Sequence, residues 1–184
     1  MVAKALCILA EGSEEMETVI IVDVLRRGGV EVVLAGLEGV EPVKCSRGVV
    51  LVPDSSLDSA LLNVSYDAII LPGGGPGAKA LAESAKVKVL LTDQEAAGRI
   101  VGAICAAPTA LLEHGIGKGK RLTSYPSFKD VLSKDYIYTQ AQVEVDGSLI
   151  TSQGPGTSFS FALRLVELLV GKEKAEEISA AMLL

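Results

Sequence analysis

The stretch "VGAICAAPTALLEHG", residues 101–115, sets a pattern that the rest of the chain repeats. It passes from a continuous apolar run to a helical pattern, which predicts a buried strand followed directly by a helix. Pro108 suits the first turn of that helix, and Gly115 suits its end. Cys105 lies at the junction of the two elements. The residues around it are small: Gly102, Ala103, Ala106 and Ala107.

Apolar runs and helical patterns alternate on both sides of this unit. Continuous apolar strands are typical of parallel sheets that helices cover on both faces. The sequence therefore predicts an α/β three-layer sandwich with flavodoxin-like or Rossmann-like winding and a mostly parallel sheet. Strands are expected at 3–10, 30–36, 66–72, 99–105 and 120–126, as a hairpin within 43–57, and around an Asp146–Gly147 turn within 136–152. Helices are expected at 13–28, 84–98, 107–115, 156–171 and 172–184.

Composition narrows the class of protein. The chain has 184 residues, of which 49% are hydrophobic and 22% charged, so we expect one globular domain over residues 1–184. A net charge of -6 and the lack of Trp argue against nucleic-acid binding. Neither a signal peptide nor a membrane span is evident. We expect a soluble protein of the cytoplasm, with the nucleus and mitochondria as further compartments.

The three cysteines are far apart in the sequence, at Cys7, Cys45 and Cys105, and the chain has one histidine. Their number and spacing argue against a disulfide framework. A structural zinc site needs ligands at closer spacing. We therefore expect no metal and no cofactor.

Cys105 has two interpretations. Small neighbours between a strand and a helix suit a nucleophile elbow, and the N-terminus of the following helix favours the thiolate. A packed core thiol is the alternative, because free cysteines are among the most buried residues. His114 is the one candidate histidine base, but about 10 Å of helix separates it from Cys105. A cation at the helix C-terminus is its simpler role.

Carboxylates are the remaining candidates for acid–base chemistry. Glu17 follows the first strand, whose end can neighbour the end of the fourth strand in a sheet wound from its middle. A buried Glu17 would have a raised pKa and could donate a hydrogen bond to a thiolate. Alternatively, Glu17 belongs with Glu14 and Glu15 to an ordinary acidic first turn of the helix, which Ser13 caps at its N-terminus. The glycine-rich segment 73–77 suits either an oxyanion-binding loop or a tight turn.

Five segments together resemble the parkinsonism-associated DJ-one proteins, within the ThiJ/PfpI superfamily. They are "LAEGSEEMETV", "VKCSRGV", "LPGGGPGA", "GAICAAPTALL" and "SQGPGTSFSFAL", in the family's order. The resemblance runs from about residue 4 to the last helix. It implies a flavodoxin-like fold and a homodimer.

The resemblance also implies roles for particular residues. Cys105 matches the family's reactive, easily oxidised cysteine, and Glu17 matches the protonated glutamate that hydrogen-bonds it. Gly74 and Ala106 match residues whose backbone N–H groups face the site. Arg47 matches an arginine near the site and the dimer interface, where Cys45 matches a second cysteine.

Two positions depart from the family pattern. Tyr125 stands where many members have a histidine, so a Cys–His pairing for proteolysis or deglycation cannot operate through that position. Tyr125 retains a hydroxyl that can donate a hydrogen bond to a substrate. Val52 stands where some relatives have a third cysteine, so a redox role there does not transfer.

The resemblance implies a cofactor-independent glyoxalase or deglycase that acts on methylglyoxal, glyoxal and their adducts and protects against oxidative stress. Cys105 would attack the aldehyde and Glu17 would move the proton. The alternative is a redox sensor or oxidation-regulated chaperone whose Cys105 is oxidised to sulfinic acid. An amidotransferase-like hydrolase is the weakest interpretation, because it needs a His–Glu pair and His114 is badly placed.

Overall fold

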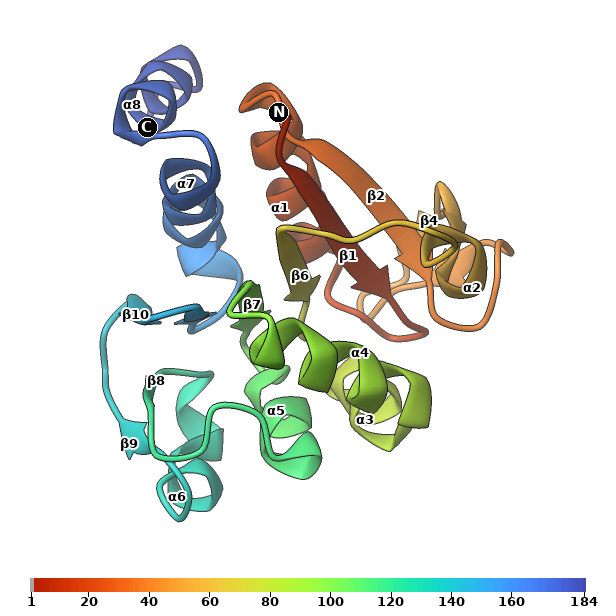
Figure 1. Ribbon diagram of the computed structural model, residues 1–184, viewed down its shortest axis with the longest axis vertical. Coiled ribbons are helices and arrows are strands. Elements are labelled where there is room, and N and C mark those ends of the chain that lie inside the picture. Colours follow the sequence, from red (N-terminus) through yellow and green to blue (C-terminus); the bar gives the residue numbers. More distant parts are fainter. Residues whose placement is uncertain (1) are drawn as a thin grey trace.

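The computed structural model describes residues 2–184 and contains a seven-stranded sheet (Figure 1). Every pair of neighbouring strands is parallel except β10 and β11. The mostly parallel sheet of the sequence prediction is confirmed. In spatial order the strands are β10 (Val143–Asp146), β11 (Leu149–Ser152), β7 (Ile100–Ile104), β6 (Ala68–Leu71), β1 (Lys4–Leu9), β2 (Glu31–Gly36) and β5 (Ser55–Ser56).

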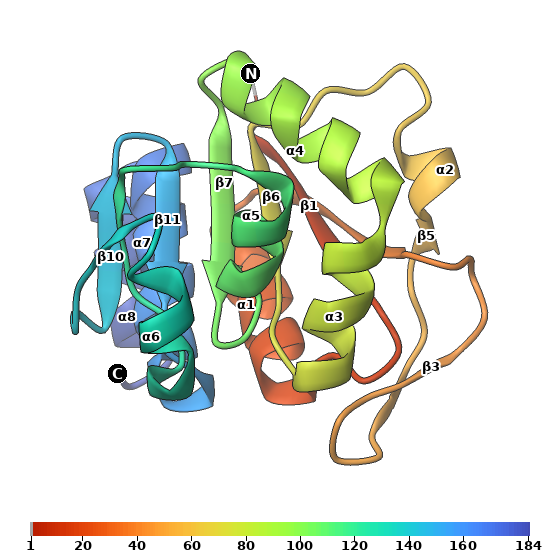
Figure 2. The same cartoon turned by 90° about the horizontal axis from the view of Figure 1, so that it is seen from below.

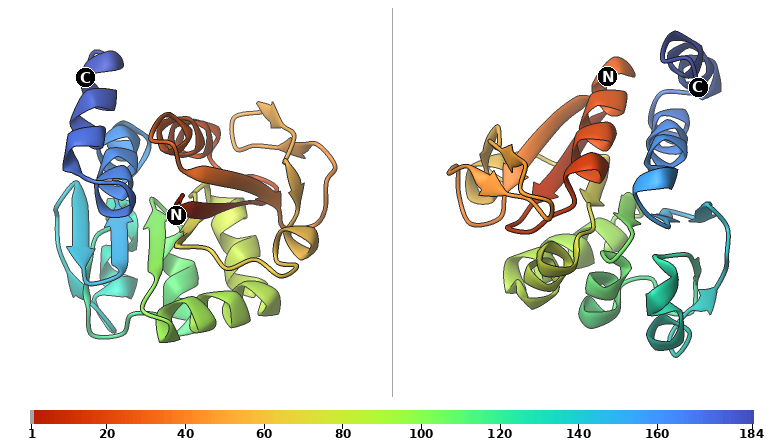
Figure 3. Two further views of the ribbon diagram at one scale, coloured as in Figure 1. Left: turned by 45° about the horizontal axis from the view of Figure 1, so that its top comes forward. Right: turned by 180° about the vertical axis from the view of Figure 1, so that it is seen from behind.

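Helices cover both faces of the sheet, which makes the three predicted layers. Figure 2 shows one group in front of the sheet: α3 (Gly75–Glu83), α4 (Ala85–Ala96) and α5 (Pro108–His114). The opposite group lies behind it, and Figure 3 shows these helices from two further sides: α1 (Glu15–Arg27), α7 (Ser158–Leu169) and α8 (Lys172–Ala181). Two short helices lie outside these groups: α2 (Leu57–Ala60) and α6 (Lys129–Leu132). Within residues 2–184, no helix combines the length and apolar character needed to cross a membrane.

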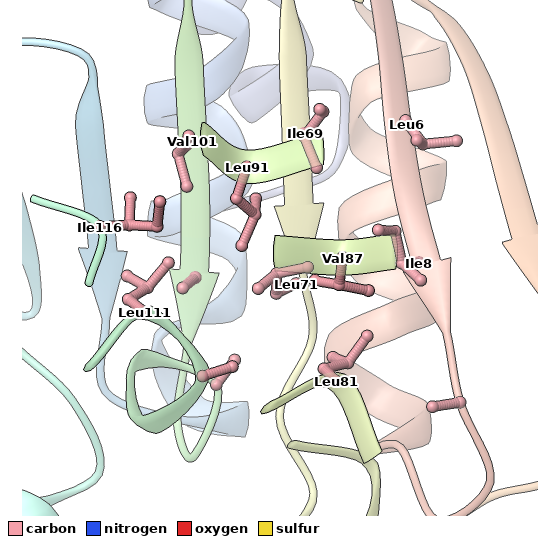
Figure 4. Packing of buried hydrophobic residues seen from close by; sticks show 14 of the residues in the cluster. Leu6, Ile8, Ile69, Leu71, Leu81, Val87, Leu91, Val101, Leu111 and Ile116 are labelled. Carbon is pink, nitrogen blue, oxygen red and sulfur yellow. The ribbon is translucent and has the colours of Figure 1, made fainter. Parts of the chain in front are cut away.

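Strand β1 shows why the strands are apolar without interruption. Successive side chains of a strand point to opposite faces. Leu6 and Ile8 belong to the core on the side of α3 and α4, where Figure 4 shows Ile8 beside Val87, whereas Ala5 and Cys7 belong to the core on the side of α1 and α7. Each fully buried leucine or isoleucine contributes about 1.5–3 kcal/mol of transfer free energy. Burial on both faces therefore leaves no position for a polar residue from Ala5 to Leu9, whereas Lys4 at the start of the strand is exposed.

Two smaller sheets flank the main one. The hairpin expected within 43–57 is present as the antiparallel pair β3 (Val43–Lys44) and β4 (Val50–Leu51). The strand expected at 120–126 is shorter than predicted, because only β8 (Arg121–Leu122) is a strand and it pairs with β9 (Ile137–Tyr138), outside the main sheet.

Helix α3 was not predicted from the sequence, because it begins at Gly75 within the segment that suited a glycine-rich loop. Glycine is a poor helix former, so local propensity hides this helix. The N-cap Gly74 has φ +86°, a conformation that glycine adopts without strain, and Pro76 lies in the first turn. The loop therefore ends earlier than expected.

The N-cap of α1 also differs from the prediction. Glu14, not Ser13, caps this helix, and its carboxylate accepts a hydrogen bond from the backbone N–H of Glu17 at 2.7 Å. The Ser13 hydroxyl instead accepts a bond from the backbone N–H of Ala10. Ser13 thus stabilises the turn between β1 and α1.

Candidate active site

Cys105 lies on a tight turn between β7 and α5. Its φ is +63°, a left-handed conformation that a residue with a side chain rarely adopts. Two backbone hydrogen bonds hold it there: its N–H donates to the Ser152 carbonyl at 3.0 Å, and its carbonyl accepts from Tyr125 N–H at 2.9 Å. The geometry is that of a nucleophile elbow. Cys105 is half-buried, whereas Cys7 and Cys45 are buried.

Glu17 is fully buried one turn into α1. The expected adjacency of the first and fourth strands is wrong, because β6 lies between β1 and β7. Gly73, which follows β6, closes this gap: its backbone N–H donates to Glu17 Oε2 at 2.7 Å. A Cβ added at Gly73 would lie 2.6 Å from Cys105 Cβ and 2.7 Å from Glu17 Oε2. The thiol and the carboxyl group therefore meet around a position that admits only glycine.

The two groups influence each other's protonation. Burial raises the pKa of Glu17 to about 7, against the hydrogen bonds from Gly73 and Cys105. Burial, and then the negative charge of Glu17, raises the pKa of the Cys105 thiol to about 12. The backbone N–H groups of Gly74 and Ala106 lower that pKa, but by less. The expected low thiol pKa is thus wrong. A proton on Glu17 removes the opposing charge, but burial, the larger cause of the raised thiol pKa, remains.

Glu17 Oε1 supports a protonated carboxyl group. This oxygen is buried and has no hydrogen-bond partner of its own within residues 2–184. A buried carboxylate oxygen without a donor is costly, whereas a protonated one can donate to the neighbouring sulfur. The arrangement therefore favours a protonated Glu17 below its raised pKa.

The raised pKa of Glu17 makes stability depend on pH. Because the folded state holds this proton more tightly than the unfolded state, the stabilisation is complete below about pH 4.5 and is lost as pH rises through about 7. We expect the free energy of unfolding to fall by about 3 kcal/mol across this window relative to Glu17→Gln, which has no proton to lose. Urea unfolding of both proteins at several pH values measures this difference. Parallel pH profiles for the two proteins would contradict the shifted pKa.

Gly73→Ala tests the close contact between the two groups. The new methyl group would overlap Cys105 Cβ and Glu17 Oε2, and Ala106 N at 3.0 Å leaves no room to shift. We expect a loss of about 1–3 kcal/mol in stability and an altered reaction rate of the Cys105 thiol with iodoacetamide. Gly75→Ala is the matched control, since a Cβ there meets no atom within 4 Å. Equal stability of the two variants would show that the site tolerates the methyl group.

A cavity of about 620 Å³ opens over Cys105. Five residues singled out in the sequence line it: Cys105, Gly74, Ala106, Arg47 and Tyr125. Glu17 lies outside the lining and is inaccessible to solvent. Further residues that line this cavity were not predicted from the sequence, and three of them are apolar: Met16, Phe128 and Pro155. No periodicity in the sequence signals them, because they come from separate turns and a helix end.

Glu14 and Glu15 do more than provide an acidic first turn. Glu14 lines the cavity. Glu15 holds the loop that carries Arg47: its carboxylate accepts from Ser46 Oγ at 2.9 Å and from Arg47 N at 2.8 Å. Burial acts to raise the pKa of Glu15, but these hydrogen bonds outweigh it and the net pKa is lowered. The interpretation of both glutamates as ordinary first-turn residues was therefore incomplete.

His114 lies apart from this cavity. Its ring is buried at the end of α5, and Nε2 lies 2.9 Å from the Leu81 carbonyl oxygen of α3. It ties two helices together rather than facing Cys105. Within the described part of the chain, no three His, Cys, Asp or Glu side chains are grouped to hold a metal ion.

A mostly parallel sheet covered by helices on both faces, with a cysteine on a tight turn after β7, defines a class of α/β proteins. Comparison with known proteins identifies this class. Residues 3–168 match the model of the DJ-1/PfpI family, and the chain belongs to this family. It is 55% identical to protein DJ-1alpha of Drosophila melanogaster over 180 residues, which cover 97% of this chain and 83% of that protein. It is 44% identical to the glutathione-independent glyoxalase DJR-1.2 of Caenorhabditis elegans over 169 residues, 91% of this chain and 89% of the relative.

The fold comparison agrees. The crystal structure of Drosophila melanogaster DJ-1beta matches with a TM-score of 0.98 and 50% sequence identity. The match covers 100% of this chain and 99% of that one. The predicted fold and the resemblance to the DJ-one proteins are both confirmed.

Proposed function

We propose that this protein is a glutathione-independent glyoxalase that converts methylglyoxal and glyoxal to lactate and glycolate. One observation carries the proposal: a cysteine on a strained elbow meets a buried carboxyl group of raised pKa beside an open cavity. A nematode relative that is 44% identical bears the name glutathione-independent glyoxalase. At an aldehyde, a thiol can act as the nucleophile and a neighbouring acid–base group can transfer the proton.

The first step joins the substrate to the protein. The Cys105 sulfur attacks the aldehyde carbon and forms a carbon–sulfur bond, while the thiol proton passes to Glu17. The aldehyde oxygen becomes an alkoxide, and the N–H groups of Gly74 and Ala106 are its expected hydrogen-bond donors. Proton return from Glu17 to this oxygen yields a hemithioacetal, so no net charge accumulates in the cavity.

The second step moves hydrogen between adjacent carbons. Glu17 removes the proton from the sulfur-bearing carbon, and the electron pair forms an enediolate with the neighbouring carbonyl. The hydroxyl proton of the hemithioacetal passes from the first oxygen to the second. Return of the proton to the second carbon gives a thioester of the 2-hydroxy acid. Water then cleaves the carbon–sulfur bond, which releases the acid and restores the thiol. The pKa of about 7 suits Glu17 to both proton transfers near neutral pH.

Deglycation of hemithioacetal and aminocarbinol adducts on protein side chains is a related activity of the same site. Arg47 and Tyr125 line the cavity beside Cys105 and are the proposed contacts to substrate oxygens. Product analysis by NMR tests the glyoxalase reaction: lactate should form from methylglyoxal without glutathione or added metal. Absence of lactate from the folded protein would overturn the proposal.

A redox role is the second candidate, because Cys105 is the cysteine that lines the cavity. Oxidation to sulfinic acid adds two oxygens, and these would accept hydrogen bonds from the N–H groups of Gly74 and Ala106 and from a protonated Glu17. With dilute peroxide, we expect Cys105 to be oxidised at least about tenfold faster than buried Cys7. Peptide mass analysis over time measures both rates. Equal rates would remove the support for a sensor.

A homodimer is the proposed assembly. Exposed apolar side chains gather on α1 and around β4, namely Met16, Val19, Val50 and Val52. Such a patch on a soluble fold suits contact with a second copy. Sedimentation of the protein and of Val50→Asp tests this: the variant should be monomeric, and an unchanged mass would place the contact elsewhere.

A further inference from the structure

We propose a second binding site, remote from Cys105, that takes a small organic carboxylate with an apolar body. It is a cavity of about 460 Å³ between α4 and the segment that precedes β6. Figure 2 shows α4 beside the end of the sheet where β7 begins, opposite the end that leads to Cys105. The five residues of β7 separate the two cavities by about 15 Å. This volume lies within the usual range of small-molecule sites.

Gln94 of α4 builds the polar end of this cavity. Its side chain is 1% exposed, and its Nε2 group donates to two backbone carbonyls, Tyr66 O at 3.0 Å and Ile100 O at 3.1 Å. Both amide hydrogens are therefore used at the starts of β6 and β7. The amide oxygen is thereby oriented and accepts a hydrogen bond from Arg99 Nε at 3.0 Å.

Arg99 is held by this bond through one edge of its guanidinium group. Arg99 is one of the lining residues, and neither of its Nη atoms has a hydrogen bond or ion pair to any residue from 2 to 184. A positioned guanidinium with two free donors matches the geometry of a carboxylate. Because Gln94 fixes Arg99 before a ligand binds, less side-chain entropy is lost on binding.

The other charges in the lining favour a monoanion. Lys86 forms an ion pair with Asp58, and Asp93 is the one carboxylate among the lining residues. Because Asp58 neutralises Lys86, Arg99 is the cation of the lining that is free to bind an anion, and Asp93 is the opposing charge. Arg99 would repel a cationic ligand at the polar end of the cavity. Asp93 would repel a dianion more strongly than a monoanion.

The remaining walls are apolar, and they specify the body of the ligand. Tyr66 donates its hydroxyl hydrogen to the Ala60 carbonyl at 2.8 Å, so no polar group of its ring needs a ligand partner. Apolar side chains from two segments complete the wall: Leu61, Val64, Ile69, Val89 and Leu90. Val89 and Val64 are exposed, and a hydrocarbon or aromatic ligand would cover them.

Titration with 3-phenylpropionate, followed by amide chemical shifts in NMR, tests the site. We expect shifts at Val64, Val89 and Arg99 with a Kd on the order of 1 mM, as suits so small a ligand. The neutral 3-phenylpropionamide should bind about tenfold more weakly, because it lacks the charge that Arg99 recognises. This comparison needs no variant and does not depend on whether a mutant folds.

Two variants locate the anion. Arg99→Met keeps an unbranched apolar side chain but removes the charge, and it should bind acid and amide equally weakly. Arg47→Met is the matched control, since Arg47 is the cation of the Cys105 cavity, and it should leave the acid's affinity unchanged. Equal binding of acid and amide to the unmodified protein, loss of binding in Arg47→Met, or no shift at these amides at about 10 mM probe would each overturn the proposal.

Discussion

Cys105→Ala is expected to lower lactate formation from methylglyoxal at least about 1000-fold. The proposed reaction begins with a carbon–sulfur bond, and alanine has no atom that forms one. We expect the variant to fold, because Cys105 lines a cavity and the backbone hydrogen bonds that hold the elbow do not involve its sulfur. Time-resolved NMR of lactate, at equal protein concentrations, measures the two rates.

Cys7→Ala is the control for Cys105→Ala. Cys7 is a fully buried residue of β1 in the core on the α1 side of the sheet, far from solvent and from substrate. This variant loses some stability through a small cavity but should keep its turnover. If Cys105→Ala and the unmodified protein form lactate at the same rate, the chemistry lies elsewhere and the proposed mechanism is wrong.

Glu17→Gln has the second largest expected effect. Glutamine preserves the shape of the side chain and can still approach Gly73 and Cys105, but it cannot move a proton. We expect kcat to fall by about 100- to 10,000-fold with a smaller change in KM, because the aldehyde still enters the cavity. The pH dependence of kcat that arises from a group of pKa about 7 should disappear in the variant.

The control for this variant is Asp23→Asn, which makes the same carboxylate-to-amide change on the same helix. Asp23 is exposed and paired with Arg27, away from the cavity. Its turnover should match that of the unmodified protein. Full kcat in Glu17→Gln would assign proton transfer to another group. Loss of kcat without loss of the pH dependence would point to a structural role for Glu17.

Much of the site follows from local pattern. The apolar run before Cys105, the small residues around it and Pro108 after it predict a strand, a tight turn and a helix, and all three are present. These features depend on backbone propensity within one segment, which a sequence shows directly. The local pattern did not predict helix α3, because glycines hide its start at Gly75. It also predicted too long a strand at 120–126, where the backbone hydrogen-bonds to Cys105 and Thr151 instead of extending the main sheet.

The sequence by itself determined the alternation of strands and helices, the coverage of both sheet faces and the elbow at Cys105. The tertiary structure alone decided which carboxylate meets the thiol. Glu17 and Gly73 are 56 residues apart, and their hydrogen bond exists because β6 inserts between β1 and β7. Strand order depends on the packing of whole layers, and no local propensity encodes it. The same reason governs the pKa of Glu17, since burial beneath a neighbouring loop raises it.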